Sequence, residues 1–248
     1  MILPLRIPHP GPDACKVCGG QSEAAGTVDF AKNCEERRGI VLPRTEAPIH
    51  YHRCGDCGLL YTRAFDGWSH AMFRRWIYND DYATVDPDYV SVRPMANAAT
   101  VAALMKRNGL TRTLDYGGGN GDLARALVAR GFDAASWDPM EPGQVLPGQR
   151  DFQLVTAFEV MEHTPTPRAT AREMTVSAGA RGLVLFSTLA LDTAAPRAVD
   201  HWYVAPRNGH VTIHTRASLQ ALFARLGWQV HHFSDAYHLA HRGNVRLT

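Results

Sequence analysis

The C-terminal part of the chain alternates short apolar runs with segments of helical periodicity. Each apolar run predicts a β-strand, and the intervening segments repeat apolar residues every three or four positions, as amphipathic helices do. The expected strands are 112–116, 134–138, 153–158, 182–188, 228–233 and 236–241, and the expected helices are 121–130, 166–179 and 216–226. This alternation predicts an α/β fold built on a parallel sheet.

One connection in this alternation is short. Only residues 139–150 separate the second expected strand from the third. Twelve residues cannot hold a helix, a strand and a second helix, so we expect one element to be reduced or missing there.

The first 110 residues follow another pattern. Residues 1–14 hold four prolines and predict an extended lead-in. Beyond them the expected elements are strands at 49–53 and 59–62, a helix at 68–78, a polar connection at 79–89 and a helix at 94–108. We therefore expect an N-terminal module in 1–65, a helical lead-in or lid in 66–110, and the α/β domain in 111–248.

Composition limits the classes of function. The 248 residues are 45% hydrophobic and 20% charged, as in an ordinary globular protein, and the formal net charge is only +2. No apolar run is long enough to span a bilayer, and no signal-peptide pattern is visible, so we expect a cytoplasmic protein. The small charge argues against nucleic-acid or membrane partners.

The cysteines form two matched pairs. Cys15 and Cys18 are separated by two residues, as are Cys54 and Cys57, and a glycine follows each pair. Four thiolates at this spacing predict a tetrahedral structural zinc site in a zinc-ribbon-like module, with residues 19–53 as an inserted hairpin or loop. Two disulfides suit a cytosolic chain poorly, and a redox pair is expected at the start of a thioredoxin-like helix. Cys34 is left as an ordinary thiol.

A glycine-rich turn connects the first α/β strand to its helix. The pattern is Asp115-x-Gly117-x-Gly119-Asn120-Gly121. Glycines let a ligand approach the backbone, and the following helix start offers unpaired N–H groups. The pattern predicts a nucleotide-cofactor cradle; the alternative is a tight β–α connection.

The acidic residues around this turn favour S-adenosylmethionine (SAM) over NAD. The spacing differs from the dinucleotide pattern G-x-G-x-x-G, and Asp115 at the strand end would meet an ammonium group. Asp138 ends the next strand, where its carboxylate can accept two hydrogen bonds from a ribose diol. The alternative for Asp138 is a helix cap or a surface turn.

These motifs, followed by 152–163 with its E-V-x-E-H ending, resemble the class I SAM-dependent methyltransferases over about residues 90–245. The resemblance implies a Rossmann-like seven-stranded sheet with helices on both faces, a terminal reversed hairpin and SAM across the carboxyl ends of the strands. It places Asp115 and the glycines near the methionine portion and Asp138 at the ribose. Phe158 and Glu159 would line the pocket, while Met140 and Glu141 would substitute in the shortened adenine region.

The cysteine module together with this domain is similar to sugar C-methyltransferases that act on nucleotide-linked deoxysugars. That resemblance implies catalytic roles for Glu162, His163 and Tyr82. Those relatives are longer and carry an extra C-terminal domain, so a glycan precursor or another natural product is an equally open methyl acceptor. Histidine titrates near neutrality, so His163 would be the base; alternatively, Glu162 and His163 form a structural cap.

A second polar cluster follows the strand expected at 182–188. His201, Tyr203, Arg207 and His210 are the candidate acceptor-binding residues, with Arg207 able to grip an anion by two hydrogen bonds; the alternative is structural hydrogen bonding. His210 and His214 have the spacing of a metal pair on a helix, but their β-branched neighbours favour a strand. The histidines of the terminal hairpin, His231, His232, His238 and His241, are expected to face solvent or a partner.

Two other functions fit parts of the sequence. One is an RNA methyltransferase with a zinc module, although residues 1–90 carry 10 Lys/Arg against 12 Asp/Glu and a module that grips phosphates should be basic. The other is a non-catalytic zinc-ribbon interaction protein, against which the intact acid–glycine motif argues. The leading prediction is a SAM-dependent methyltransferase of a small molecule.

Overall fold

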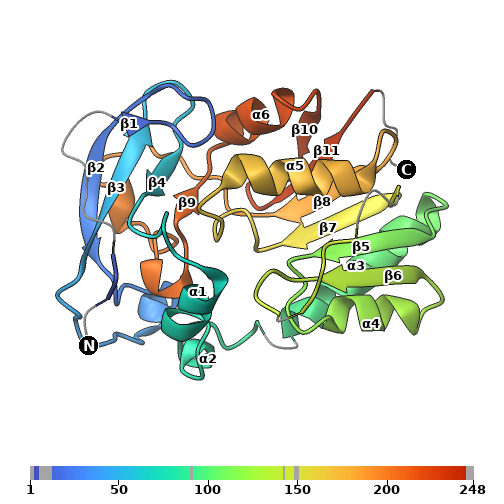
Figure 1. The fold of residues 1–248 in the computed structure, drawn as a ribbon, viewed down its shortest axis with the longest axis horizontal. Coiled ribbons are helices and arrows are strands. Elements are labelled where there is room, and N and C mark those ends of the chain that lie inside the picture. The colour runs from blue at the N-terminus through green and yellow to red at the C-terminus, as the bar shows by residue number, and fades with distance from the viewer. Residues whose placement is uncertain (1–2, 6–12, 90–91, 142, 148–150, 244–248) are drawn as a thin grey trace.

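The computed structural model describes residues 3–5, 13–89, 92–141, 143–147 and 151–243. Two sheets lie side by side (Figure 1). Most of the lead-in expected at 1–14 lies outside the described residues. None of the helices within these ranges is long and apolar enough to cross a membrane.

The larger sheet has six strands in the order β10-β11-β8-β7-β5-β6. The strands β5, β6, β7 and β8 run parallel, and β11 is antiparallel to both of its neighbours. Their bounds are β5 Arg112–Tyr116, β6 Asp133–Trp137, β7 Leu154–Phe158, β8 Leu183–Ser187, β10 Gln229–His232 and β11 Tyr237–His241. The parallel sheet and the reversed terminal hairpin are therefore confirmed.

The expected seventh strand is absent from the described part of the chain, where β6 forms the sheet edge. The segment 139–150 contains three prolines and two glycines. Proline cannot donate to a strand ladder and glycine weakens a strand, so this composition ends the sheet early. The expectation of seven strands was wrong for these residues, whereas the expectation of a reduced element at 139–150 was correct.

Helices cover both faces of this sheet (Figure 1). On one face, α3 (Val92–Arg107) and α4 (Asp122–Val128) pack on Leu154 and Leu183. On the other, α5 (Pro167–Ala178) and α6 (Arg216–Ala224) pack on neighbouring residues such as Val155. Successive residues of a strand point to opposite faces of the sheet. Because helices cover both faces, these strands are apolar at nearly every position.

The smaller sheet has five antiparallel strands in the order β1-β2-β3-β4-β9. Their bounds are β1 Asp13–Ala14, β2 Gln21–Asp29, β3 Pro48–Cys54, β4 Leu60–Thr62 and β9 Thr212–Ile213. The insert between the cysteine pairs thus forms the β2–β3 hairpin. Strand β9 comes from the connection after β8, so the C-terminal half of the chain completes the N-terminal sheet.

Short helices close this half of the molecule. They are α1 (His70–Trp76), α2 (Tyr82–Val85) and the 3₁₀ turns Cys34–Arg38, Ala198–Asp200 and Pro206–Asn208. Aromatic and aliphatic side chains from these elements and from the small sheet share one core that includes Tyr51, Phe65, Tyr82, Val211 and Ile213. The division of the chain at residues 65 and 110 stays a prediction.

We expect Ile213→Ala to lower the free energy of unfolding by about 2–5 kcal/mol, because it empties a fully buried site where β9 joins the small sheet. Urea unfolding measures the change. The matched control is Val41→Ala, whose side chain is 73% exposed and should cost less than about 0.5 kcal/mol. Equal effects of the two substitutions would contradict this role of β9.

Candidate active site and cysteine cluster

The four paired cysteines meet at one point. Their sulfur atoms all lie within 4.8 Å of one another. The distance is 3.7 Å from Cys15 to Cys57 and 3.4 Å from Cys18 to Cys54. Sulfurs around a tetrahedral zinc ion with bonds of about 2.3 Å are about 3.8 Å apart. The donor set and its geometry therefore fit zinc.

Backbone amides support the sulfurs as metal knuckles do. The N–H groups of Val17 and Gly20 point at the sulfurs of Cys15 and Cys18 at 3.4 and 3.3 Å. Gly19 and Gly58, which follow the two pairs, have φ values of +82° and +71°. An L side chain is strained there, so the sequence needs glycine at these positions.

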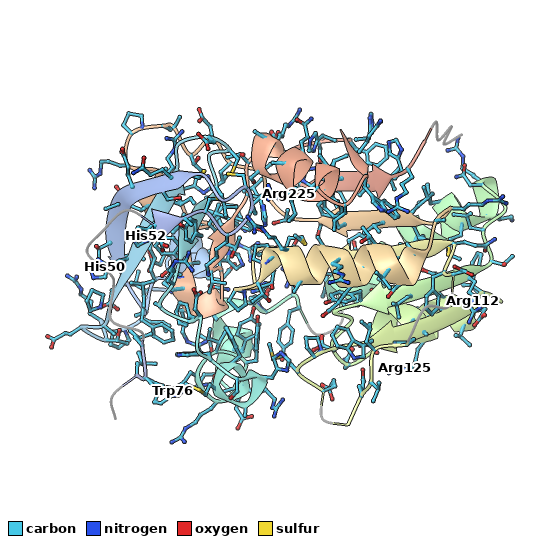
Figure 2. The ribbon with its side chains drawn as sticks, turned by 45° about the horizontal axis from the view of Figure 1, so that its top comes forward. His50, His52, Trp76, Arg112, Arg125 and Arg225 are labelled. Atoms are coloured by element: carbon cyan, nitrogen blue, oxygen red, sulfur yellow. The ribbon has the colours of Figure 1, made fainter. Side chains whose placement is uncertain are left out.

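The cysteine knuckles are docked on the helices of the larger sheet. On α5, Arg168 donates from Nε to the Val17 carbonyl at 2.7 Å. Arg225, labelled in Figure 2 at the end of α6, donates to the Cys18 carbonyl at 3.1 Å. Thr215 caps α6 and donates its hydroxyl to the Cys57 carbonyl at 2.6 Å. The two halves of the molecule are thus joined at the cysteine site.

The glycine turn is held between two carboxylates. Asp115, the second-last residue of β5, is almost fully buried, and one of its oxygens accepts the Thr156 hydroxyl at 2.8 Å. Burial raises the pKa of Asp115 to about 7. Asp138 accepts the Gly119 N–H at 2.8 Å and the Met140 N–H at 2.7 Å. A carboxylate oxygen accepts more than one hydrogen bond, so Asp138 caps the turn and retains capacity for a ligand.

The backbone of this turn is bare where a ligand would approach. Gly119 has a φ of +54°, and a Cβ added there would meet no atom within 4 Å. Gly121 precedes α4 with a φ of +80°, and the first helix N–H, that of Asp122, is bonded to the Asn120 side chain. Asn120 bonds to Asp122, and its carbonyl accepts Arg125, which Figure 2 labels on α4. The N–H groups of Gly117, Gly118 and Gly121 bond to backbone carbonyls, and those of Gly119 and Asp122 bond to side chains. What the turn offers a ligand is therefore close approach to its glycine backbone.

The glycine turn touches the segment after β7. A Cβ at Gly117 would lie 2.5 Å from Val160, so only glycine permits this approach. In that segment Glu159 adopts a φ of +55°, a strained conformation for a residue with a side chain. Its Oε1 accepts the Ser187 hydroxyl at 2.7 Å. Burial, with the nearby charge of Glu162, raises the pKa of Glu159 to about 7.

Glu162 is fully buried beneath the same segment. Its Oε1 accepts the Tyr203 hydroxyl at 2.6 Å. The Glu162 carbonyl accepts the N–H groups of Val211 and Thr212 at 2.8 and 3.0 Å. Burial raises the pKa of Glu162. The residue therefore faces the interior of the protein.

His163 lies beside His210 and Tyr78. Its ring centre is 4.8 Å from that of His210 and 6.0 Å from that of Tyr78. Burial, together with the charge of Arg93, lowers the pKa of His163 to about 4. The imidazole is therefore neutral at physiological pH and keeps a lone pair.

Comparison with known proteins decides the family. The family model described as a methyltransferase domain matches residues 89–233, more than half of the chain. The chain belongs to the methyltransferase-domain family. Membership of a methyltransferase family favours an enzyme over the non-catalytic alternative.

Solved structures with the same fold include the mitomycin 7-O-methyltransferase MmcR, with a TM-score of 0.52 and 14% identity over 72% of this chain and 62% of that one. TnmH has a TM-score of 0.51 and 15% identity, and the match covers 69% of this chain and 61% of TnmH. An O-methyltransferase family protein from Burkholderia thailandensis has a TM-score of 0.51 and 13% identity, and the match covers 69% of this chain and 63% of that one. The methyltransferase spans about three fifths of each of these chains. No curated protein matches its sequence.

The candidate acceptor-binding residues of the methyltransferase separate into two groups. Tyr203 and His210 meet at Glu162 and His163. The Arg207 guanidinium instead donates to the Ile77 carbonyl and the Asn79 side chain. His201 is half-buried, and its Nδ1 accepts the Tyr203 N–H. The roles of these residues toward an acceptor stay predictions.

Tyr82 lies one ring away from His163. It packs against Tyr78, and its hydroxyl is 3.3 Å from the Asn208 carbonyl. Tyr78 is therefore the tyrosine in contact with His163. Phe158 is half-buried and packs on Tyr237.

Sequence reasoning missed the hydroxyls that hold the acids. Thr156 lies opposite Asp115 and Ser187 opposite Phe158 in the parallel sheet. Only strand register could have revealed these pairs. The expected exposure of His238 was wrong: it is fully buried and bonds to the Thr188 carbonyl, because β11 lies inside the sheet.

We expect Cys54→Ser to abolish tight metal binding at the cysteine cluster and to destabilise residues 15–65, because a hydroxyl is a poor replacement for a buried thiolate ligand. Elemental analysis and thermal unfolding measure the two effects. Cys34→Ser is the matched control, since Cys34 lies outside the cluster. A Cys54→Ser protein with undiminished zinc would contradict the four-thiolate site.

Proposed function

We propose that this enzyme transfers a methyl group from SAM to a small-molecule acceptor, such as a natural product, a glycan precursor or a nucleotide sugar. The observation that carries the proposal is the bare glycine turn between Asp115 and Asp138 at the carboxyl ends of β5 and β6. Open α/β sheets bind ligands at this edge.

In this proposal the donor rests on the glycine turn. Asp115 faces the ammonium group of SAM, which compensates for the burial of the carboxylate. Asp138 takes the ribose hydroxyls through its remaining acceptor capacity. Gly117, Gly119, Asn120 and Gly121 contribute backbone to the pocket, and Phe158 and Glu159 line it.

The acceptor lies on the side of the turn formed by residues 159–163. The contact between Val160 and Gly117 of the glycine turn supports this arrangement. Glu162 and His163 are the proposed catalytic residues, with His163 turned to the acceptor as a neutral imidazole that can take up a proton. Tyr82 stays a candidate at the outer wall, with Tyr78 between it and His163.

We also propose that the cysteine cluster holds a structural zinc ion. The cluster lies at the five-stranded sheet and is bonded to α5 and α6. A zinc ion there would therefore hold in place the connection that carries Tyr203 and His210. Reduced thiols are needed for this site, which fits a cytoplasmic location.

The primary experiment is calorimetric titration of the zinc-loaded protein with SAM and with its demethylated product, S-adenosylhomocysteine. We expect one site per chain for each. Transfer of a labelled methyl group to small molecules in a cell extract would then reveal the acceptor class. A protein that binds neither compound would contradict the proposal.

The SAM affinity should depend on pH through Asp115. Its pKa of about 7 means that the carboxylate is largely protonated at lower pH, and a cationic amino group favours the ionised form. We therefore expect the affinity for SAM to rise between about pH 5.5 and 7, below the range where an α-amino group loses its own proton.

Asp115→Asn is the matched variant, because it keeps the size of the side chain and removes the charge. It should bind SAM more weakly and lose most of the rise with pH; any remaining rise comes from other acids such as Glu159 and Glu162, whose pKa values are also raised. A pH dependence identical to that of the wild type would exclude Asp115 as the partner of the amino group.

A further inference from the structure

Two histidines and one glutamate converge just beyond Val160, which contacts the glycine turn at Gly117. Glu162, His163 and His210 each present one ligand atom, and these atoms all lie within 4.8 Å of one another. The residues come from distant parts of the chain, Glu162 and His163 after β7 and His210 just before β9. The cluster shares no residue with the four cysteines.

The carboxylate of Glu162 is incompletely satisfied. Its Oε1 accepts the Tyr203 hydroxyl, whereas its Oε2 is buried and has no hydrogen-bond partner among the residues that the structure describes. An unpaired buried carboxylate oxygen is costly. A cation between Glu162 and the two imidazoles removes that cost.

The tautomer of His210 suits a metal ligand. Its Nδ1 lies 2.7 Å from the Tyr203 carbonyl oxygen. A carbonyl oxygen can only accept a hydrogen bond, so Nδ1 carries the proton and Nε2 keeps the lone pair. A second ring nitrogen that donates to a backbone carbonyl is the usual support of a metal-bound histidine.

A single residue orients two of the three ligands. Tyr203 is buried, donates its hydroxyl to Glu162 and accepts the His210 N–H on its carbonyl. Its ring also packs on His210, with 4.4 Å between ring centres. Such outer partners fix the direction of the ligating atoms before a metal arrives.

We propose that Glu162, His163 and His210 form a second metal site, which binds a divalent ion of the first transition row. Two imidazoles and a carboxylate are typical ligands of zinc and of iron(II) in sites that keep open coordination positions. Ligand atoms around such an ion are about 3.3 Å apart for tetrahedral bonds of about 2.0 Å, so rotation of the side chains closes the cluster.

The ion would define the chemistry of the acceptor, a step that rests on the proposed function. An acceptor hydroxyl bound at an open position has a lowered pKa and loses its proton to water. The resulting oxygen attacks the methyl carbon of the sulfonium; the carbon–sulfur bond breaks, and its electron pair stays on sulfur. In the metal-bound enzyme this replaces the proton-accepting role proposed above for His163, which becomes a ligand of the ion, and the methylated atom is oxygen.

Metal content tests the site. The protein is dialysed against excess zinc, freed of unbound metal by gel filtration and analysed for zinc per chain. The variants are Glu162→Gln, which keeps the acceptor for Tyr203, and His210→Asn, whose amide preserves the N–H toward the Tyr203 carbonyl. Each should hold one zinc equivalent less than the wild type, and His231→Gln, an exposed histidine, should match the wild type.

The cysteine site supplies an internal reference. Cys54→Ser should lose a different equivalent, and combining it with His210→Asn should lose both. Tyr203→Phe should keep all three ligands and weaken binding at the second site by about 10- to 100-fold. Circular dichroism and thermal unfolding identify any variant that fails to fold. Equal zinc content in wild type and in folded Glu162→Gln and His210→Asn would overturn the site.

A measurement on the wild type alone covers the case in which the variants do not fold. Mn²⁺ binds four thiolates too weakly to displace zinc. Titration of the zinc-loaded protein, after brief chelation of weakly held metal, should remove one equivalent of the free Mn²⁺ resonance signal per chain. Folded wild type that takes up neither a second zinc nor Mn²⁺ would also overturn the site.

The outcome separates the site from the methyl transfer. SAM titration is read independently: metal binding without SAM binding supports the site and contradicts the proposed function. SAM binding with no second metal equivalent supports the proposed function and contradicts the second metal site. A methylated product carrying the new group on carbon or nitrogen would overturn the role of the ion at an acceptor oxygen.

Discussion

The hydrogen bonds of Glu162 hold the active-site region together. Its carbonyl accepts two backbone N–H groups at the start of β9, and its side chain accepts the Tyr203 hydroxyl. Through these bonds the turn after β7 is fixed to the connection that leaves the larger sheet and completes the smaller one. Because Glu162 is fully buried, loss of either partner would leave a costly polar group unpaired.

The bonds of Glu162 explain why the smaller sheet and the larger sheet form one unit. The knuckles of the cysteine cluster receive hydrogen bonds from α5 and α6, and β9 pairs with β4. The segment that carries Tyr203 and His210 is therefore held from both sides. A metal in the cysteine cluster would stabilise the segment that carries Tyr203 and His210 without taking part in chemistry.

Burial sets the electrostatics of the pocket. The pKa of Asp115 is raised to about 7 by its burial, and that of Glu159 is raised to about 7 by partial burial and the charge of Glu162. Each carboxylate accepts one hydroxyl donor, from Thr156 or Ser187. His163 is kept neutral by the same burial. Groups that ionise reluctantly in the free protein respond strongly to a cationic ligand, which is a property of many functional sites.

Much of the fold could be read from local sequence. The strand at 112–116 and the helices on both sheet faces were predictable because apolar periodicity and glycine stops act over a few residues. The nine-residue strand β2 was missed, since its alternation is weak and it is held mainly by pairing with β3. Periodicity predicted the six strands of the larger sheet, and the short 139–150 segment predicted a missing element, whereas the seventh strand was implied only by the family resemblance.

The sequence by itself determined the cysteine spacing, the acid–glycine turn and the E-V-x-E-H segment, because each is a local pattern whose geometry follows from neighbouring residues. Only the tertiary structure decided that Arg207 binds its own chain, that Tyr78 lies next to His163, and that His210 joins Glu162 and His163. Those outcomes depend on contacts between residues far apart in the chain, which are selected by strand register and burial and leave no periodic trace in the sequence.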